Sequence, residues 1–258
     1  MTISIPKFQT LLVAISGRRV DITLNRPDKL NAINKAMVTE LHALMDVLED
    51  EADHSVLVFQ GAGEKAFVAG ADIAELKARK SPEALEAINA RLFDRIARFP
   101  FATVAKIRGF CFGGGMELSL ACDIRIGSTD SLFAQPEVGL GILPGAGATF
   151  RLPKIVGRGL AREMIFSGLR IDAQRALDAG LLNHVVEPAK LDEVTATIVD
   201  RILKQGPEAV AAAKRVMSRD ENAADSTAAV FAQAALFESA DKMKRMEDFL
   251  SKAKEGKK

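Results

Sequence analysis

Three consecutive glycines, Gly113–Gly115, constrain the fold of this chain more than any other stretch. Glycines have no side chains, so another molecule can approach their backbone closely. A short helical pattern follows at once and runs to about Asp123. It places the glycine N–H groups at a helix N-terminus, where negative charge is stabilised. We therefore expect the chain to fold around a turn and a helix whose first amides are open to a ligand.

Glu117 lies one turn into this helix, beside the apolar residues Met116 and Leu118. A carboxylate with apolar neighbours is costly to bury unless it is paired or takes part in a reaction. Open backbone amides close to such an acid suit an acid/base enzyme that acts on a carbonyl group. The alternative interpretation is an ordinary tight turn followed by a solvated or capping glutamate.

Length and charge narrow the possible functions. At 258 residues the chain can bury a sizeable core, either as one large domain or as a main domain with a smaller helical one. The formal net charge of +1 argues against nucleic acid or an anionic membrane as a partner. No apolar run has the length that spans a bilayer, and residues 1–10 lack the pattern of a secretion signal.

The cysteines and histidines argue against a metal site. Cys111 and Cys122 have apolar surroundings, which is typical of free, buried thiols in a reducing compartment. We therefore expect a cytoplasmic protein. The three histidines are scattered and no ligand spacing matches a metal site, so neither a metal nor a serine–histidine–aspartate mechanism is expected.

Strand and helix patterns alternate along most of the chain. Hydrophobic spacing predicts strands at 11–15, 20–24, 55–60, 101–107, 124–126, 132–134 and 184–187. Helices are predicted at 34–51, from Asp72 as N-cap to about 80, from Pro82 onward, and at 150–156, 160–167, 172–179, 191–204, 207–218 and 226–254. In the helix after Pro82, an apolar stripe contains Leu85, Ile88, Leu92 and Phe93, and core packing is its favoured interpretation.

Two loops add further candidates. The strand-like run from Ala66 ends in small residues before Asp72, so its backbone amides are also expected to be open to a ligand. Glu137 follows a proline in a loop rich in glycine. Residues 61–65 lack the glycine and hydroxyl residue of a phosphate-binding loop, and the glycines of 141–147 do not match a dinucleotide fingerprint.

Five short motifs occur in one order along the chain. They are Asn25-Arg26-Pro27 with Asn31-Ala32, then Ala69-Gly70-Ala71-Asp72-Ile73, Gly113-Gly114-Gly115-Met116-Glu117, Gln135-Pro136-Glu137, and Leu143-Pro144-Gly145-Ala146-Gly147. Together they resemble the enoyl-CoA hydratase/isomerase (crotonase) family, and they are closest in motif to enoyl-CoA hydratase. The resemblance covers nearly the whole chain.

The resemblance implies an α/β fold, a crotonase-like spiral of ββα units with two roughly perpendicular sheets. It implies that residues 1–195 form the spiral core with the acyl-CoA site. Residues 196–258 would form a C-terminal helical region that covers coenzyme A and mediates oligomerisation. The expected assembly is a homotrimer or a hexamer built as a dimer of trimers.

The resemblance also assigns the site residues. The N–H groups of Ala71 and Gly114 would form an oxyanion hole for the thioester oxygen. Glu117 would act as the base that orients water, and Glu137 as the acid that protonates Cα. Such a pair is expected to have separated pKa values. The residues implied in substrate binding are Ala69, Asp72, Ile73, Gly113, Gly145 and Lys29.

The expected reaction is hydration of 2-enoyl-CoA to 3-hydroxyacyl-CoA, without a cofactor, since coenzyme A belongs to the substrate. An alternative is isomerisation of 3-enoyl-CoA to 2-enoyl-CoA by Glu137 alone. A non-catalytic acyl-CoA or RNA binder is a third possibility, which the low net charge disfavours. The apolar stripe at 85–93 lies where the family shapes its acyl pocket.

Overall fold

Two β-sheets organise the computed structural model, which describes residues 5–50, 56–78 and 85–217. The predicted helix at 226–254 and the start of the helix expected after Pro82 lie outside these ranges. In spatial order, the large sheet consists of β1 (Leu11–Ser16), β2 (Arg19–Leu24), β3 (Val56–Gly61), β5 (Ala102–Ile107), β7 (Ile124–Ser128) and β10 (His184–Val186). β1 and β2 pair antiparallel, and the following pairs are parallel.

The small sheet contains β4 (Ala66–Val68), β6 (Phe110–Phe112), β8 (Leu132–Ala134) and β9 (Ile171–Asp172). β4, β6 and β8 are parallel, and β9 runs antiparallel to β8. Each strand of this sheet has only two or three residues. The sequence predicts β8 and the strand-like run that contains β4, whereas β6 and β9 are too short to display a hydrophobic period and are not predicted. The two-sheet α/β architecture that the sequence implied is confirmed by the strand pairing.

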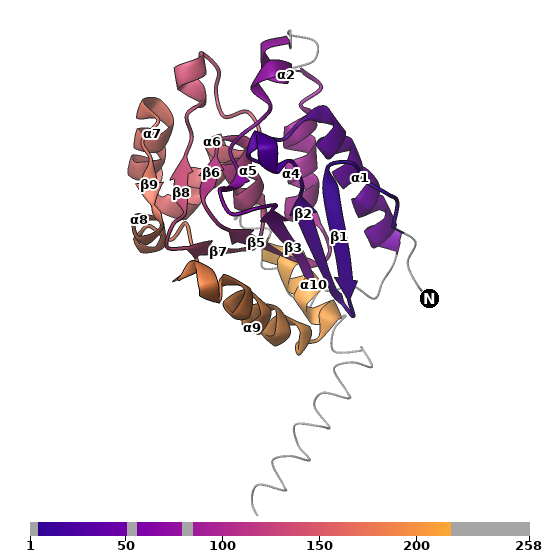
Figure 1. Cartoon of the computed structure of the whole chain (residues 1–258). Coiled ribbons are helices and arrows are strands. Elements are labelled where there is room, and N and C mark those ends of the chain that lie inside the picture. The colour runs from indigo at the N-terminus through magenta and orange to yellow at the C-terminus, as the bar shows by residue number, and fades with distance from the viewer. Residues whose placement is uncertain (1–4, 51–55, 79–84, 218–258) are drawn as a thin grey trace, which may run out of the picture.

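Both faces of the large sheet are covered, as expected for parallel strands. Along β3, Leu57 and Phe59 point into the main core, whereas Val56 and Val58 belong to a second cluster on the opposite face. The second cluster packs against α9 (Leu191–Leu203), which lies with α10 (Pro207–Met217) below the sheet in Figure 1.

The main core is closed by helices on the other face. They are α1 (Lys35–Asp50), α4 (Ile88–Arg98), α5 (Gly114–Ala121), α6 (Ala148–Val156), α7 (Arg158–Ser167) and α8 (Ala173–Asp178). α2 (Ile73–Ala78) and the loop that carries the 3₁₀ turn η2 (Glu137–Leu140) project from the same end of the molecule (Figure 1). Two further 3₁₀ turns are η1 (Pro27–Lys29) and η3 (Pro188–Lys190). The helices predicted within the described ranges are confirmed.

The predicted division of the chain at residue 195 falls inside α9, a continuous helix that packs on the large sheet. Lys214 of α10 joins the same body. Its Nζ lies 2.8 Å from Asp123 Oδ2 and donates to the carbonyl oxygen of Phe101 at 2.9 Å. The first residues of the expected C-terminal region are therefore packed on the core, and the separate role of that region stays a prediction.

The C-terminal end of α5 is fixed by Arg125, whose guanidinium group is buried. It donates to the carbonyl oxygens of Cys122 at 2.7 Å, Ser119 at 3.3 Å and Leu181 at 2.7 Å. A cation at this end of a helix satisfies carbonyls that lack a partner within the helix and opposes their partial negative charge. Both ends of this short helix are thus defined, the far end by an arginine and the near end by Gly113.

Candidate active site

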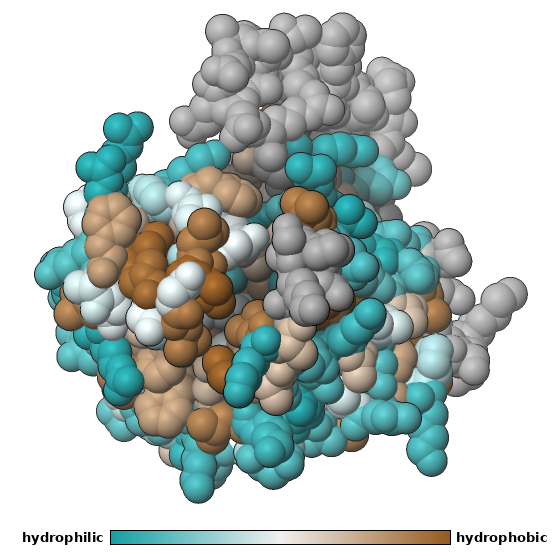
Figure 2. Space-filling view, turned by 90° about the horizontal axis from the view of Figure 1, so that it is seen from above, coloured by the Kyte–Doolittle hydropathy of each residue, from teal (hydrophilic) through white to brown (hydrophobic). Residues whose placement is uncertain are grey.

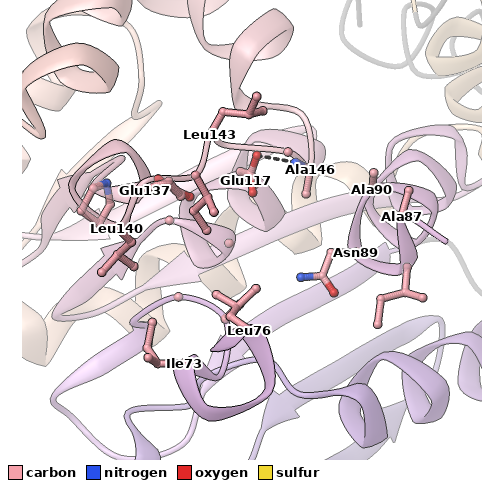
Figure 3. Close-up of a pocket in the computed structure, with 18 of the residues that line it drawn as sticks. Ile73, Leu76, Ala87, Asn89, Ala90, Glu117, Glu137, Leu140, Leu143 and Ala146 are labelled. Carbon is pink, nitrogen blue, oxygen red and sulfur yellow. Dashed lines mark hydrogen bonds between the residues drawn. The ribbon is translucent and has the colours of Figure 1, made fainter. Parts of the chain in front are cut away.

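A cavity of about 680 Å³ opens between α2, the start of α4, the start of α5 and the η2 loop. Its walls are mainly apolar, with Ile73, Leu76, Ile88, Leu140 and Leu143 among the residues that form them. Figure 3 shows two carboxylates, Glu117 and Glu137, in this wall. A mostly apolar cavity with few polar groups is the usual form of a small-molecule site.

Gly113 and Gly114 form one edge of the cavity. Gly113 has φ 51° and ψ −122°, a conformation that only glycine adopts readily, and its N–H donates to the carbonyl oxygen of Ala134 at 3.0 Å. This turn ends β6 and begins α5. Gly114 is the first residue of the helix, so its N–H has no partner within the helix, and it donates to no other described residue.

Ala71 brings a second free amide to the same place. A Cβ atom placed on Gly114 would lie 3.5 Å from the Ala71 nitrogen, so the two backbones are adjacent. Ala71 forms a single parallel bridge with Ile33, in which Ile33 N donates to Gly70 O at 2.9 Å and Asp72 N donates to Ile33 O at 2.8 Å. The Ala71 N–H itself has no acceptor among the described residues. Two amides from separate loops are therefore available to one oxygen atom.

The first predicted motif holds the loop of Ala71 in place. Arg26 donates to Asp72 Oδ2 at 2.9 Å and to the carbonyl oxygen of Ala32 at 2.6 Å. The buried Asn31 donates to the carbonyl oxygens of Ala62 and Ala66 at 3.0 and 2.8 Å. Asp72 also accepts from Ala74 N at 3.1 Å, so it caps α2 as predicted.

Glu117 is 4% exposed and lies inside the wall of the cavity. Its Oε1 accepts hydrogen bonds from the N–H groups of Ala146 at 2.7 Å and Ala148 at 3.1 Å. Burial raises the pKa of Glu117, while these two amides and the charge of Arg151 act in the opposite direction. The carboxylate is thus desolvated but has donors that stabilise its ionised form.

Glu137 begins η2 and approaches the glycine turn. A Cβ atom on Gly113 would be 3.0 Å from Glu137 Oε1, so the carboxylate lies directly against the glycine turn. With its amide nitrogen turned toward Glu137, the buried Gln135 donates to both carboxylate oxygens, at 3.0 and 2.9 Å. Burial, followed by the charge of Glu117, raises the pKa of Glu137 to about 7.

Eight of the ten predicted site residues line this single cavity. They are Ala69, Ala71, Ile73, Gly113, Gly114, Glu117, Glu137 and Gly145. The other two, Asp72 and Lys29, lie outside its lining. The side chain of Asp72 is occupied by Arg26 and by the α2 cap, and Lys29 ends η1. Their roles in substrate binding stay predictions.

The apolar stripe of residues 85–93 is divided between the two interpretations. Leu92 and Phe93 are fully buried in the main core, whereas Ile88 lines the cavity and Leu85 is 78% exposed. Within α4, therefore, only the first turn can shape what the cavity binds. The core interpretation is confirmed for the rest of this helix.

Several site residues received no role from the sequence. Ala146 and Ala148 contribute through their backbone N–H groups, which side-chain chemistry does not reveal. Gln135 was part of a motif, but its contact with Glu137 depends on the fold of the loop between them. Asn89 lines the cavity from the start of α4, but in the sequence it is only one of several polar residues between the apolar positions of the stripe.

Neither a metal site nor a membrane span is present among the described residues. In these parts of the chain, no three side chains of the metal-binding types are grouped closely enough to hold a metal ion. None of the helices in residues 5–50, 56–78 and 85–217 combines the length and the apolar character needed to cross a membrane.

Residues 17–257 match the family model described as enoyl-CoA hydratase/isomerase. The chain is 36% identical to the short-chain-enoyl-CoA hydratase of Clostridium acetobutylicum and 36% identical to the crotonyl-CoA hydratase of Syntrophomonas wolfei. Each match covers 96% of this chain and 97% of the relative. Among solved structures, the enoyl-CoA hydratase of Bacillus anthracis superposes with a TM-score of 0.91 at 33% identity, over 95% of this chain and 97% of that chain.

Proposed function

The chain belongs to the enoyl-CoA hydratase/isomerase family, and on this premise we propose that it adds water to 2-enoyl-CoA thioesters, giving 3-hydroxyacyl-CoA. One observation carries the proposal. Two carboxylates, Glu117 and Glu137, share a cavity with two backbone amides that have no other acceptor among the described residues. Since two similar proteins are named for short-chain and crotonyl thioesters, crotonyl-CoA is the first substrate to test.

The thioester oxygen accepts hydrogen bonds from Ala71 N–H and Gly114 N–H. Negative charge develops on this oxygen when a nucleophile adds to Cβ, so preorganised amides stabilise the transition state more than the ground state. The N-terminus of α5 adds its positive partial charge at the same point. Removing one donor of this kind typically raises the barrier by about 3 kcal/mol.

Glu117 removes a proton from water, and the resulting hydroxide forms the bond to Cβ. The electron pair of the double bond moves toward the thioester oxygen, and Glu137 delivers its proton to Cα. A pKa of about 7 leaves a large share of Glu137 protonated at neutral pH, as an acid requires. The two N–H donors on Glu117 favour its ionised form, as a base requires. Because the two carboxyls interact, they titrate as a coupled pair.

Hydration requires no metal or redox cofactor in this scheme, because two acids and two amides supply every group that the reaction uses. The presence of both glutamates favours hydration over isomerisation, for which Glu137 alone would suffice. A cytoplasmic location stays a prediction, and the two described cysteines are free and buried, which suits a reducing compartment.

We also propose that the chain assembles as a trimer or a dimer of trimers. Support comes from an exposed apolar patch at the mouth of the cavity. Figure 2 shows hydrophobic surface gathered on the face of the molecule that is seen from above. The patch includes Val138 and Phe150, together with Leu140, Ile142 and Leu143, which also line the cavity. Apolar surface of this kind usually marks an interface. Light scattering on the purified full chain tests the assembly, and a monomer would contradict it.

The activity is tested by mixing the purified chain with crotonyl-CoA and following the ultraviolet absorbance of the conjugated thioester. We expect the absorbance to fall as 3-hydroxybutyryl-CoA forms, with product identity checked by mass spectrometry. Glu117→Gln separates the two reactions of the family, since it removes the base needed for hydration but leaves Glu137 to move a proton in a 3-enoyl thioester. A wild-type protein that only isomerises would overturn the assignment.

A further inference from the structure

Arg151, in the first turn of α6, reaches back over the start of its own helix toward the loop that holds Glu117. Its Nη1 atom donates to the carbonyl oxygen of Ala146 at 3.2 Å. A Cβ atom on Gly147 would be 2.0 Å from the same nitrogen, so the guanidinium group lies directly against the backbone of this glycine. The side chain of Arg151 is 13% exposed. It is therefore packed on the loop and does not extend into solvent.

Ala146 is held from both sides. Its N–H donates to Glu117 Oε1 at 2.7 Å, and its carbonyl oxygen accepts from Arg151. The N–H of Ala148, two residues further on, donates to the same Oε1 atom at 3.1 Å. Because the donor and the acceptor of Ala146 belong to one residue, a shift of its backbone would disturb both contacts. Arg151 thus fixes the orientation of the amides that Glu117 needs.

Asp94 of α4 holds the other end of the guanidinium group, since its Oδ1 atom accepts a hydrogen bond from Arg151 Nη2. Arg151 consequently joins the loop of Glu117 to the helix whose first turn lines the cavity. A cation in the first turn of a helix is opposed by the positive partial charge of the helix N-terminus. The carboxylate of Asp94 and the carbonyl oxygen of Ala146 offset this cost and keep the charge beside the loop.

We propose that Arg151 is a positioning residue for hydration, which orients Glu117 through the Ala146 loop and keeps its carboxylate ready to accept a proton from water. This inference rests on the proposed function, because it explains how the proposed base is prepared. A carboxylate in an apolar wall is costly to ionise unless fixed donors or a cation compensate for the lost water. Burial raises the pKa of Glu117, and the charge of Arg151 lowers it, as do the two amides.

The other titratable groups around Glu117 do not have this effect. Glu137 faces it from the η2 loop, and a second negative charge disfavours ionisation. Lys77 lines the cavity from α2, but its side chain is exposed to solvent. Cys111 of β6 is neutral, because burial raises the pKa of its thiol to about 12. β4 has no titratable side chain, and the carboxylate that α4 contributes is the one that binds Arg151.

The test removes the charge and both donors with Arg151→Met, which keeps an unbranched side chain. We expect kcat/KM for crotonyl-CoA to fall and its acidic limb to move to higher pH, because Glu117 then takes up a proton more readily. The loss should be on the order of tenfold larger on the acidic limb than near neutral pH, as expected when a neighbouring opposite charge is removed. KM should change little, because Arg151 does not line the cavity.

Arg95→Met is the matched control. Arg95 also lies on α4 and joins two helices through carboxylates, with Asp46 at 2.7 Å and Glu49 at 2.9 Å, but none of these partners holds the loop of Glu117. Its loss should lower thermal stability and leave the pH profile of kcat/KM unchanged. If Arg151→Met does not fold, Arg151→Lys replaces it. A lysine keeps the charge but lacks the planar fork, so the shift should be smaller and in the same direction.

An acidic limb that stays in place in the Arg151 variant, with stability lowered as in Arg95→Met, would overturn the proposal and leave Arg151 with a packing role alone. A wild-type chain that hydrates no enoyl thioester contradicts the proposed function instead. NMR titration of ¹³C-labelled glutamate then still decides on Arg151, with the Glu117 signal assigned by its absence from Glu117→Gln. The pKa of Glu117 should be higher in Arg151→Met than in the wild type, and an unchanged pKa would contradict the inference.

Discussion

Glu117 and Glu137 face one cavity but are held in different ways. Glu117 projects from a helix, is almost fully buried and accepts two hydrogen bonds from backbone N–H groups. Glu137 begins a 3₁₀ turn in a loop, and its described partner is the side-chain amide of Gln135. Burial raises the pKa of both carboxyls, and that of Glu137 is raised to about 7. Two identical side chains in one cavity are thus surrounded by different hydrogen-bond donors, which act on their pKa values in addition to burial.

The largest expected effect comes from removing either carboxylate. Glu117→Gln and Glu137→Gln should each lower kcat for hydration by about 10³- to 10⁴-fold, because general acid–base catalysis contributes up to this magnitude. Glutamine keeps the size and an acceptor oxygen, so both variants should remain folded. Steady-state kinetics with crotonyl-CoA checks the effect, with circular dichroism as the folding control. If one variant retained nearly full activity, the two-acid scheme would be wrong.

The next largest effect is expected at Gly114, and it distinguishes the role of the open amide in catalysis from the role of the neighbouring glycine in packing. Gly114→Ala places a Cβ 3.5 Å from Ala71 N, within the gap where the substrate oxygen binds, so kcat/KM should fall about 100-fold with little change in stability. Gly115→Ala is the matched control. Its Cβ would lie 2.6 Å from Val68 Cβ and closer still to Val68 O, so the main loss should be in stability.

Kinetics and thermal unfolding of both alanine variants distinguish these outcomes. Equal losses of stability at Gly114 and Gly115 would show that the first glycine is needed for packing and not for the open amide.

A smaller effect concerns stability. The pKa of Glu137 is raised from 4.5 to about 7 in the folded chain, so the folded state holds this proton more tightly than the unfolded state does. Stability from this group is therefore lost as pH rises from about 4.5 to 7. Glu137→Gln lacks this penalty and should be more stable than the wild type by about 2 kcal/mol at high pH, allowing for partial solvent screening.

Denaturant unfolding of the wild type and Glu137→Gln on both sides of this pH window checks the sign. The gain should nearly vanish on the acidic side. A gain that did not depend on pH would point to packing and not to ionisation.

The smallest effect is the pH dependence of the reaction. Because Glu137 acts in its protonated form, kcat/KM should decline about tenfold per pH unit well above a midpoint near 7. On the acidic side, activity should fall as Glu117 takes up a proton. In Glu117→Gln the pKa of Glu137 should be lower than in the wild type, because a neighbouring negative charge is lost. NMR titration of ¹³C-labelled glutamate measures this shift, and an unchanged pKa would argue against direct coupling.

Much of this site follows from local sequence. Gly113–Gly115 predicted a helix start with open amides because only glycine permits the backbone of that turn. The resemblance to known motifs then brought Ala71 and Glu137 to the same place, and the cavity contains both. The strands of the large sheet were also predictable, because four of them, β1, β2, β3 and β5, have six residues and display their hydrophobic pattern.

Other features depend on contacts that the sequence does not display. The donors to Glu117 are backbone N–H groups 29 and 31 residues away, and any residue except proline could provide them. β6 and β9 exist because neighbouring strands pair with them, not because two or three residues favour a strand. The split of the α4 stripe likewise results from the angle at which the helix meets the cavity, so Leu92 was a misleading candidate for the pocket.

The bonds from Ala146 and Ala148 to Glu117 have a consequence beyond this reaction. Ala148 is the first residue of α6, so the proposed base also serves as the missing N-cap of a different helix. A related enzyme that evolved from this chain and no longer used Glu117 as a base could not lose the side-chain oxygen without a cost in stability. The buried N–H groups of Ala146 and Ala148 would then have no acceptor. We expect gene duplicates with new chemistry to retain an oxygen-bearing side chain here, or to rebuild the start of α6 at the same time.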